Sequence, residues 1–332
     1  MDARAIAATL AECAAAGKTA RARGAGTKWD WGGAREPDVV VETAGLDGIE
    51  HVAGDLTAVL GAGVPLADAQ AVFAAAGQRL ALDPPRAAAT VGGVLATADS
   101  GPLRHRYGAP RDLVLGATVA LADGTVAKAG SRVIKNVAGY DLAKLYAGSL
   151  GSLGVLVEAV VRLHPLPPAT ATVIAATDDP AALARSYAAL AAAPLELEAL
   201  DVRWAGGSGA VLAQVGGVLA RAEAVRAVAG LDARVEEDDA ALWAAQRDLQ
   251  GEAELKISGL PAELERTLRA VDEAGGSLAG RAGVWWVAGT DLPGWRIHEP
   301  WPEPAPALAR LAGRVKARFD PAGVLAPGVA AA

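Results

Sequence analysis

Three glycine-rich segments contain the residues whose types and spacing could do chemistry. They are residues 23–27 (RGAGT), residues 90–101 (TVGGVLATADSG) and residues 132–155 (RVIKNVAGYDLAKLYAGSLGSLGV). Glycine lets the main chain approach a ligand closely and present successive N–H groups, an arrangement that suits a diphosphate. The three segments therefore predict a site whose walls are largely main chain.

Two of the segments also have a plainer explanation. Residues 23–27 could form an ordinary turn, and they do not open a helix as the G-x-G-x-x-G fingerprint requires, so a nicotinamide-binding Rossmann unit is not expected. Residues 90–101 could serve a tight contact between a helix and a strand. Residues 132–155 are the most informative, because a core segment does not need charges, an amide and four glycines together.

Composition excludes several other kinds of protein. The chain has 332 residues, 52% of them hydrophobic, with a net charge of −7 and a single cysteine, Cys13. An acidic balance argues against nucleic-acid binding as the main task. One cysteine excludes a disulfide scaffold, a cysteine-ligated iron–sulfur cluster and a cysteine-type zinc site, and we expect no metal. With no apolar run long enough for a membrane span and no secretory signal, we expect a cytoplasmic protein.

The pattern of apolar residues and turns predicts an α+β protein in which α/β subdomains are followed by an α+β domain. We place the main boundary at the prolines near residue 168, and expect domains at 1–168, 169–305 and 306–332. The expected helices are 3–16, 66–76, 90–97, 141–147, 180–192, 218–229, 238–249, 260–274 and 305–319. The expected strands are 18–23, 39–42, 56–60, 113–121, 125–129, 155–163, 171–177, 196–204, 209–215, 254–258 and 284–289.

The order of these motifs resembles the FAD-linked oxidases of the vanillyl-alcohol-oxidase type, also called PCMH-type. Within that family the chain looks most like the FAD-binding E subunits of bacterial glycolate oxidases. The resemblance covers most of residues 18–165 and residues 316–328, which include the closing FDPAGVLAPG. It implies two α/β subdomains that hold FAD, with an α+β cap domain and a carboxyl-terminal segment that returns to the FAD domain.

The resemblance also implies which residues hold the cofactor. Residues of the first loop should hold the pyrophosphate, the second segment should line the pyrophosphate and ribityl side, and the third should contact the nucleotide through main chain. The residues so implied are Arg23, Gly24, Ala25, Gly26, Thr27, Thr90, Gly92, Gly93, Thr97, Ser100, Gly101, Gly154 and Val155.

Three positions depart from the family pattern. Relatives with covalently held flavin carry histidine where this chain has Thr27, and the single cysteine, Cys13, lies in an expected helix, so FAD should be bound noncovalently. Leu150 replaces a family carboxylate, and Ala326 replaces a family asparagine. One polar contact near the flavin should therefore be missing.

The catalytic residues are unknown from the sequence. Oxidation of a 2-hydroxy acid needs a base for the alcohol proton and a cation for the carboxylate. The family's histidine-rich cap segment is replaced here by GRAGVWW at 280–286. His105, between Arg104 and Arg106, is the one histidine worth testing; the alternative, which we favour, is that the two arginines contact a phosphate or a partner and His105 is incidental.

The tryptophans of residues 285–301 have two explanations. Trp285, Trp286, Trp295 and Trp301 lie close together in the sequence, with prolines between some of them. Exposed aromatic residues often anchor interfaces. They could equally fill the core, because the chain has only two phenylalanines.

The resemblance implies an FAD-binding subunit of a glycolate oxidase or dehydrogenase complex. Such a complex oxidises glycolate to glyoxylate and passes electrons to a non-nicotinamide acceptor. The partners would be a second FAD-binding catalytic subunit, which carries the main substrate site, and an iron–sulfur subunit. They could hold the chain peripherally at the inner membrane. One alternative is a self-sufficient FAD-dependent 2-hydroxy acid or alcohol oxidoreductase, and another is a flavin-free scaffold subunit.

Overall fold

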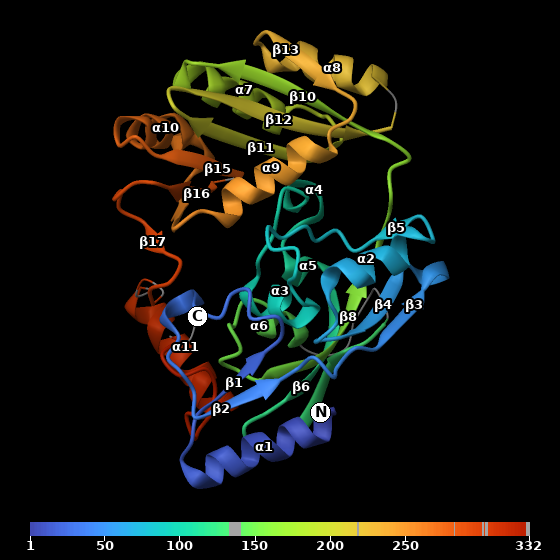
Figure 1. Ribbon diagram of the computed structural model, residues 1–332, viewed down its shortest axis with the longest axis vertical. Helices are drawn as coiled ribbons and strands as arrows, with labels where there is room; N and C mark the ends of the chain where they lie inside the picture. Colours follow the sequence, from blue (N-terminus) through green and yellow to red (C-terminus); the bar gives the residue numbers. More distant parts are fainter. Residues whose placement is uncertain (133–140, 218, 282, 301, 303–304, 330–332) are drawn as a thin grey trace. The chain divides into compact units, whose positions relative to one another are not determined.

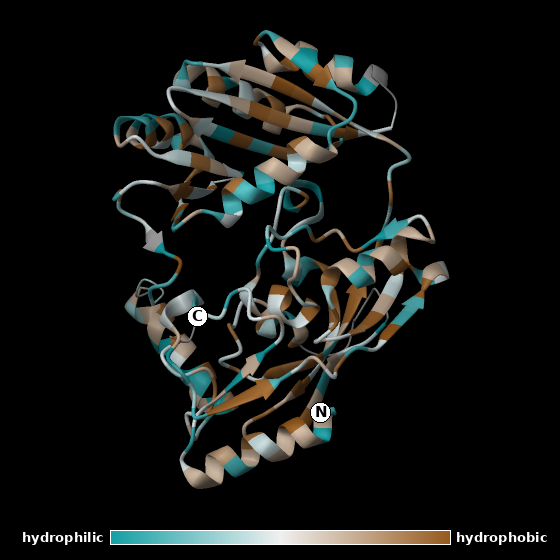
Figure 2. Cartoon of the chain, in the orientation of Figure 1, coloured by the Kyte–Doolittle hydropathy of each residue, from teal (hydrophilic) through white to brown (hydrophobic). Residues whose placement is uncertain are grey.

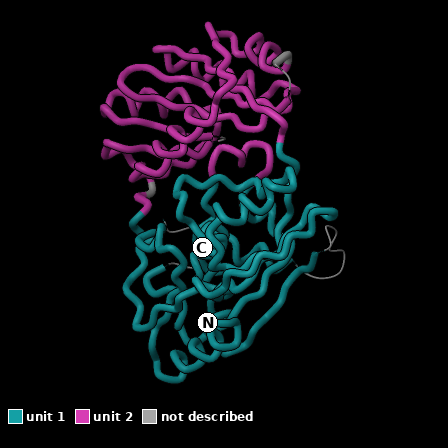
Figure 3. The backbone as a smooth tube through the Cα atoms, turned by 45° about the vertical axis from the view of Figure 1, so that its right-hand side comes forward, with its two compact units in different colours: residues 1–100, 109–166, 298–332 teal, residues 101–108, 167–297 magenta. Residues whose placement is uncertain are grey.

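The chain folds into two compact units, shown in two colours in Figure 3. The computed structural model describes residues 1–132, 141–217, 219–281, 283–300, 302 and 305–329. Unit 1 comprises residues 1–100, 109–166 and 298–332, and unit 2 comprises residues 101–108 and 167–297. The sequence-based boundaries follow residues 168 and 305, and no sequence signal indicates that residues 101–108 join unit 2.

Unit 1 contains two main sheets (Figure 1). Its helices are α1 (Ala3–Ala16), α2 (Leu66–Ala74), α3 (Val91–Thr97), α5 (Pro110–Leu113), α6 (Ala143–Tyr146) and α11 (Pro306–Phe319). Its strands are β1 (Ala20–Arg23), β2 (Val39–Glu42), β3 (Ile49–Val52), β4 (Thr57–Gly61), β5 (Gln78–Arg79), β6 (Val114–Ala120), β7 (Val126–Gly130), β8 (Val155–Arg162) and β9 (His164–Pro165). Among the described residues, β1 and β2 pair in parallel, and five antiparallel strands follow the order β3-β4-β8-β6-β7.

Helix α1 begins and ends at clear sequence signals. The Asp2 carboxylate accepts a hydrogen bond from the Ala5 N–H at 2.9 Å, and Gly17 ends the helix in the left-handed conformation with φ of 63°. Its buried face includes Ile6 and Leu10, and packs with residues of β1, β2, β6 and β8. This packing joins the two sheets of unit 1 around one apolar core.

The carboxyl-terminal segment completes the β1 sheet. Ala20 forms a parallel bridge with Leu325, and the Ala326 N–H donates to the Ala20 carbonyl at 3.0 Å. The Asp320 carboxylate accepts hydrogen bonds from the N–H groups of Val324 and Leu325, each at 2.9 Å. This buried carboxylate shapes the turn that brings residues 324–326 alongside β1.

Unit 2 is built on one sheet. Its described strands are β10 (Thr170–Thr177), β11 (Leu197–Ala205), β12 (Ser208–Gly216), β13 (Ala233–Glu236), β14 (Leu255–Ser258), β15 (Ser277–Arg281), β16 (Val284–Ala288) and β17 (Trp295–Arg296). Over the described residues these eight strands follow the order β13-β10-β12-β11-β15-β16-β14-β17. Its helices are α4 (Arg104–Tyr107), α7 (Pro180–Ala192), α8 (Leu219–Ala229), α9 (Ala240–Gly251) and α10 (Leu264–Glu273).

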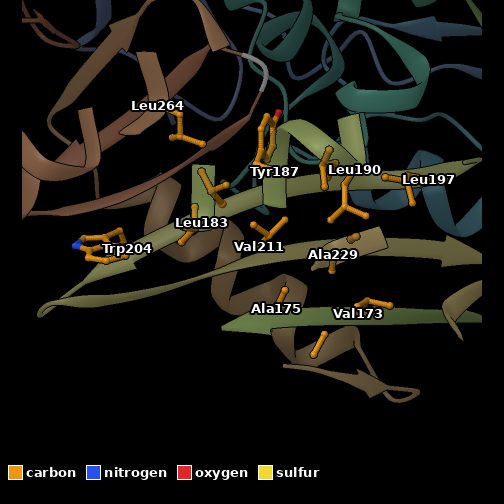
Figure 4. Close-up of a cluster of buried hydrophobic side chains, with 14 of the residues drawn as sticks. Val173, Ala175, Leu183, Tyr187, Leu190, Leu197, Trp204, Val211, Ala229 and Leu264 are labelled. Carbon is orange, nitrogen blue, oxygen red and sulfur yellow. The ribbon is translucent and has the colours of Figure 1, made fainter. Parts of the chain in front are cut away.

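The two faces of this sheet differ in chemistry. Helices α7, α8 and α10 bury an apolar cluster against one face, and Figure 4 shows Leu183, Tyr187 and Leu190 of α7 packed over the strands. Helix α9 covers the opposite face, where Trp243 packs against Ile174 and its neighbours. Hydrophobic residues concentrate along the strands of both units, whereas α9 and α10 carry many hydrophilic residues (Figure 2). Helices α7 and α10 thus bury apolar side chains, whereas the buried residues of α9 are Trp243, Gln246 and Gln250.

The predicted α+β class is confirmed, and many predicted elements occur with the same or nearly the same bounds. The helices predicted at 3–16 and 180–192 have those bounds in the structure. Strands β3, β13 and β15 were missed, because each is short and contains glycine or charged residues that weaken the strand pattern. None of the helices in the described part of the chain is long and apolar enough to cross a membrane.

The tryptophan cluster is at least partly a core feature. Trp285 and Trp286 are buried, so they fill volume inside unit 2 and are not exposed anchors. Trp301 lies outside the described residues, as do residues 133–140 of the third glycine-rich segment. The core explanation therefore holds for the two tryptophans of β16.

Candidate functional site

A pocket in unit 1 collects most of the residues that the sequence singled out. It encloses about 790 Å³ including its open mouth, within the size range of pockets for organic ligands. The predicted residues that line it are Arg23, Gly24, Ala25, Gly26, Thr27, Thr90, Gly92, Gly93, Thr97, Gly154 and Val155. Ser100 and Gly101 are not among its lining residues. Three segments that are far apart in the sequence therefore meet around one cavity.

The main chain of the first loop packs against the side chain of Thr90, just before α3. A Cβ added to Gly24 would lie 2.3 Å from the Thr90 hydroxyl oxygen, so only glycine fits there without a shift. Thr90 is also the N-cap of α3, and its hydroxyl accepts a hydrogen bond from the Gly93 N–H at 3.3 Å. The Thr97 hydroxyl donates to the Gly93 carbonyl at 2.7 Å. Thr90 thus fixes both the start of α3 and the distance to the first loop.

Residues 149–151 form a second wall of the pocket. The N–H groups of Gly148 and Leu150 donate to the carbonyls of Leu95 and Ala96, at 2.9 and 2.7 Å. These bonds hold the loop against the end of α3. Gly151 has a φ of +77° with nothing within 4 Å of an added Cβ, so its main chain is open toward the cavity that it lines.

Cationic side chains lie beside this main chain. Arg21 is buried, its guanidinium donates to the Trp29 carbonyl, and its Cζ lies 4.3 Å from the centroid of the Trp29 ring. Burial lowers the pKa of Arg21, while the carboxylates of Glu36 and Asp30 partly oppose that shift. The Lys28 ammonium is paired at 3.1 Å with the buried Asp99 carboxylate. Arg21 therefore places positive charge beside a wall that is largely main chain, an arrangement that suits a diphosphate.

Two of the departures from the family pattern, Leu150 and Ala326, lie together. Leu150 and Ala326 pack in one apolar cluster with Val329. Both have positive φ angles, 52° and 47°, which are uncommon for residues with a Cβ. At these two positions, where the resemblance implies polar side chains, the chain therefore has one apolar contact.

Half of the pocket lining was not among the residues named for the cofactor, although four of these lie within the second and third glycine-rich segments. The missed residues are Arg21, Ala22, Lys28, Trp29, Thr43, Ala62, Ala96, Ser149, Leu150, Gly151 and Leu156. One signal was available: residues two apart on a strand share a face, so Arg21 should accompany Arg23 on β1. Thr43 and Ala62 carry no such signal, because their place depends on how distant strands pair.

His105 lies in unit 2 and not in the pocket of unit 1. It is half-buried on α4, where burial lowers its pKa and the Asp201 carboxylate opposes the shift. The neighbouring Arg106 pairs with Glu198 at 3.3 Å, and the Tyr107 hydroxyl donates to the same carboxylate at 2.8 Å. Helix α4 is therefore fastened to β11 by Glu198.

Unit 2 also contains a buried polar network that the sequence did not predict. Arg281 and Asp201 are almost fully buried and form two hydrogen bonds, at 2.6 and 2.8 Å. Gln246 donates to Asp201 at 3.1 Å, and Gln250 accepts from Arg281 at 2.9 Å. The Arg281 guanidinium lies 4.7 Å from the centroid of the Trp286 ring. These bonds satisfy the charges, so the network is first of all structural.

Other histidines, and the cysteine, are engaged away from the pocket. His51 lies 2.9 Å from the Gln78 side-chain oxygen, and His298 lies 2.8 Å from the Asp30 carboxylate. Within the described ranges, no three or more His, Cys, Asp or Glu side chains lie close enough to hold a metal ion. Cys13 is buried in the α1 cluster, where burial raises its pKa, and it does not line the pocket.

The class of protein follows from the pocket and its comparison with known families. Residues 2–130 match the family described as FAD binding domain. This match agrees with the main-chain pocket, and it identifies FAD as the cofactor of this part of the chain. The chain is similar to a solved structure of an alkyldihydroxyacetonephosphate synthase, with a TM-score of 0.71 and 13% sequence identity. The match covers 98% of this chain and 74% of the synthase chain. The fold is that of PCMH-type FAD-binding proteins.

Curated relatives narrow the resemblance further. The chain is 41% identical over 116 residues to glycolate oxidase subunit GlcD of Bacillus subtilis, covering 34% of this chain and 24% of that protein. It is 43% identical over 110 residues to glycolate oxidase subunit GlcE of Escherichia coli, covering 32% of this chain and 31% of that protein. It is 36% identical over 144 residues to D-lactate dehydrogenase of Archaeoglobus fulgidus, covering 43% of this chain and 32% of that protein. The matches thus span about a quarter to a third of these relatives' lengths.

Proposed function

We propose that this chain is the FAD-binding subunit of a complex that oxidises a small 2-hydroxy acid, with glycolate as the first candidate. The single observation that carries the proposal is the pocket of unit 1, where three glycine-rich segments meet beside Arg21. Relatives named as glycolate oxidase subunits support the reaction class. Electrons would leave to an acceptor other than a nicotinamide, through a second FAD-binding catalytic subunit and an iron–sulfur subunit.

The residues of the pocket fit FAD by their chemistry. Arg21 and the main chain of residues 24–27 would neutralise and bind the diphosphate, and Gly151 would bring main chain to the ligand. Thr27 and the buried Cys13 offer no side chain for a flavin bond, which supports noncovalent binding. FAD, when bound, supplies an acceptor for the two electrons that leave the C–H bond of a hydroxy acid.

The make-up of the described pocket lining supports a subunit role. Removal of the alcohol proton needs a base, usually histidine. Among the residues described as lining the pocket there is no histidine and no carboxylate side chain. We therefore propose that the main substrate site lies on a partner chain, and that this chain takes part in assembly or electron passage.

A groove of exposed leucines on unit 1 supports a partner chain. It is lined by Leu142 and Leu145 near α6 and by Leu308 and Leu311 of α11, which are 37–54% exposed. These are four of the eight exposed large hydrophobic residues in the described part of the chain. Helix α11 also carries four basic residues and no acidic one, in a chain of net charge −7. An acidic surface of a partner subunit with apolar anchors would complement this groove.

The first experiment tests FAD binding and activity with the purified chain. We expect a yellow protein that releases intact FAD on heat or acid denaturation. We also expect the flavin to stay oxidised when glycolate or D-lactate is added anaerobically. A colourless protein that fails to take up FAD would support the flavin-free scaffold. Flavin reduction without partners would overturn the subunit role and favour the self-sufficient oxidoreductase, the alternative that the D-lactate dehydrogenase relative supports.

The second experiment tests the leucine groove. The full chain is co-expressed with the neighbouring gene products, and partners are recovered by affinity purification. We expect the double change Leu308→Asp and Leu311→Asp to abolish recovery of partners while FAD content stays unchanged. The matched control is Leu260→Asp, which changes an exposed leucine of unit 2 and should leave recovery intact. Equal recovery with both variants would show that the groove is not the interface.

A further inference from the structure

A second groove lies in unit 2, on the face of the sheet that α9 covers. It has about 740 Å³ including its open mouth. Its polar wall is formed by Arg203 of β11 and Arg234 of β13, and its apolar lining includes Ile174, Ala176, Ala210 and Leu249. The groove therefore combines two guanidinium groups with an apolar floor.

Arg203 lacks a counter-charge. Its side chain is half-buried, and within the described part of the chain it makes no ion pair or hydrogen bond. Burial lowers the pKa of Arg203, and the charge of Arg234 lowers it further, with no carboxylate to oppose the shift. Burial of a cation without a partner costs free energy. The arrangement is thus unfavourable unless an anion from outside the chain completes it.

The Asp201 carboxylate, on the same face of the sheet, cannot serve Arg203. Asp201 lies two residues earlier on β11, so its side chain is on the same side of the sheet. Both of its oxygens already accept hydrogen bonds from Arg281, and Gln246 donates a third. Glu236 is 2.8 Å from Arg234 and has no contact with Arg203. The negative charges close to the groove are therefore committed to other cations.

The strand register explains why the two arginines can share one ligand. Arg203 pairs with Ala210 of β12, and Ala210 pairs with Ala176 of β10. Arg234 of β13 pairs with Ile174, two residues from Ala176 on the same face. The arginines thus stand three strand spacings apart, roughly 14 Å, across a floor of alanines. Long side chains from both sides can reach a ligand that lies on this floor.

We propose that this groove binds an organic anion, a carboxylate or a phosphate ester, whose acidic group is held by Arg203, while Arg234, which also pairs with Glu236, supplies a second guanidinium beside it. The apolar body of the ligand lies over Ala176 and Ala210, between Ile174 and Leu249. Arginine recognises both kinds of acidic group through paired N–H donors. A two-carbon acid such as glycolate would leave most of the groove empty, so the ligand is larger. The site is independent of FAD and of the proposed function.

Calorimetric titration of the FAD-loaded full chain tests this proposal. The probes are octanoate, n-octyl phosphate, inorganic phosphate and octan-1-ol. We expect octanoate or octyl phosphate to bind, and whichever binds more tightly identifies the acidic group. Arg203→Gln should weaken that binding at least about tenfold, since it removes a charge-assisted contact. Arg203→Lys should have an intermediate effect because it keeps the charge but loses the paired donors.

Control variants and a second measurement keep the test decisive. Arg185→Gln removes an exposed arginine of the same unit and should leave binding unchanged. Should Arg203→Gln fail to fold, the wild-type melting temperature still reports binding, because a ligand of the native state raises it. Octanoate should raise it and octan-1-ol should not. Lack of binding by both amphiphilic anions, or equal binding to wild type and Arg203→Gln, would overturn the proposal. If inorganic phosphate bound as tightly as octyl phosphate, the proposed role of the apolar floor would be overturned.

Discussion

The pocket of unit 1 and the buried network of unit 2 differ in which groups are polar. In unit 1 the pocket walls are largely main chain, and glycines such as Gly24 let this main chain lie close to Thr90. In unit 2 the polar groups are side chains of strands and helices, with Arg281 and Asp201 fully enclosed. A main-chain site is damaged by adding atoms, whereas a side-chain network is damaged by removing them. This difference predicts which substitutions harm each region.

The largest expected effect is in the network of unit 2. Arg281→Met leaves the Asp201 carboxylate buried without its cation, and should lower the free energy of unfolding by about 3–5 kcal/mol. Urea denaturation followed by circular dichroism measures this loss. The matched control is Arg269→Gln, which breaks an exposed pair with Glu265 and should cost no more than about 0.5 kcal/mol. Similar losses for both variants would contradict the distinction.

The pocket of unit 1 should respond to an added methyl group. Gly24→Ala places a Cβ against Thr90 and should raise the FAD dissociation constant roughly 10- to 100-fold, because the overlap costs about 1–3 kcal/mol. Fluorescence titration of the apoprotein measures the constant. Adding Thr90→Ala to this variant should recover part of the affinity, since it removes the overlapped hydroxyl. Gly48→Ala, with open space around the added Cβ, is the control and should bind FAD normally.

The pH dependence of stability should report on His105 in unit 2. Burial lowers its pKa, so the folded chain resists a proton that the unfolded chain accepts below about pH 6.5. Stability should therefore be fully present above that pH, and should fall as the pH drops toward the pKa of the folded state. His105→Gln should flatten this part of the curve, as measured by melting temperature against pH. His105→Asn, also neutral, should give the same result; a slope unchanged in both variants would exclude His105 as its source.

The smallest effect should be a gain. Ala98 ends α3 in the left-handed conformation with φ of 50°, a position where glycine is preferred. Ala98→Gly should raise the free energy of unfolding by about 0.5–1 kcal/mol. FAD affinity should hardly change, because Ala98 does not line the pocket. A loss of stability would mean that packing of the Ala98 methyl group outweighs its backbone strain.

The same comparison explains what the sequence could reveal. The glycine-rich segments of unit 1 are local in sequence, so the residue types of 23–27 and 90–97 mark them as candidates, and the order of the motifs along the chain supports a pocket. Arg21 and Thr43 were missed because their place depends on strand pairing. In unit 2, Asp201 and Arg281 are eighty residues apart and meet only through the β11–β15 register. No spacing rule connects such residues, and neither does any rule connect Arg203 with Arg234.

The return of residues 324–326 to β1 has a consequence for biosynthesis. The first pocket loop, residues 23–27, is synthesised early. The preceding strand β1, however, lacks its neighbour at residues 324–326 until these have emerged from the ribosome. Unit 2, made almost entirely in between, can fold first as domains do during synthesis. Unit 1 is then assembled across this long interval. A nascent chain stalled before residue 324 should therefore be unable to retain flavin, however complete its glycine-rich segments are.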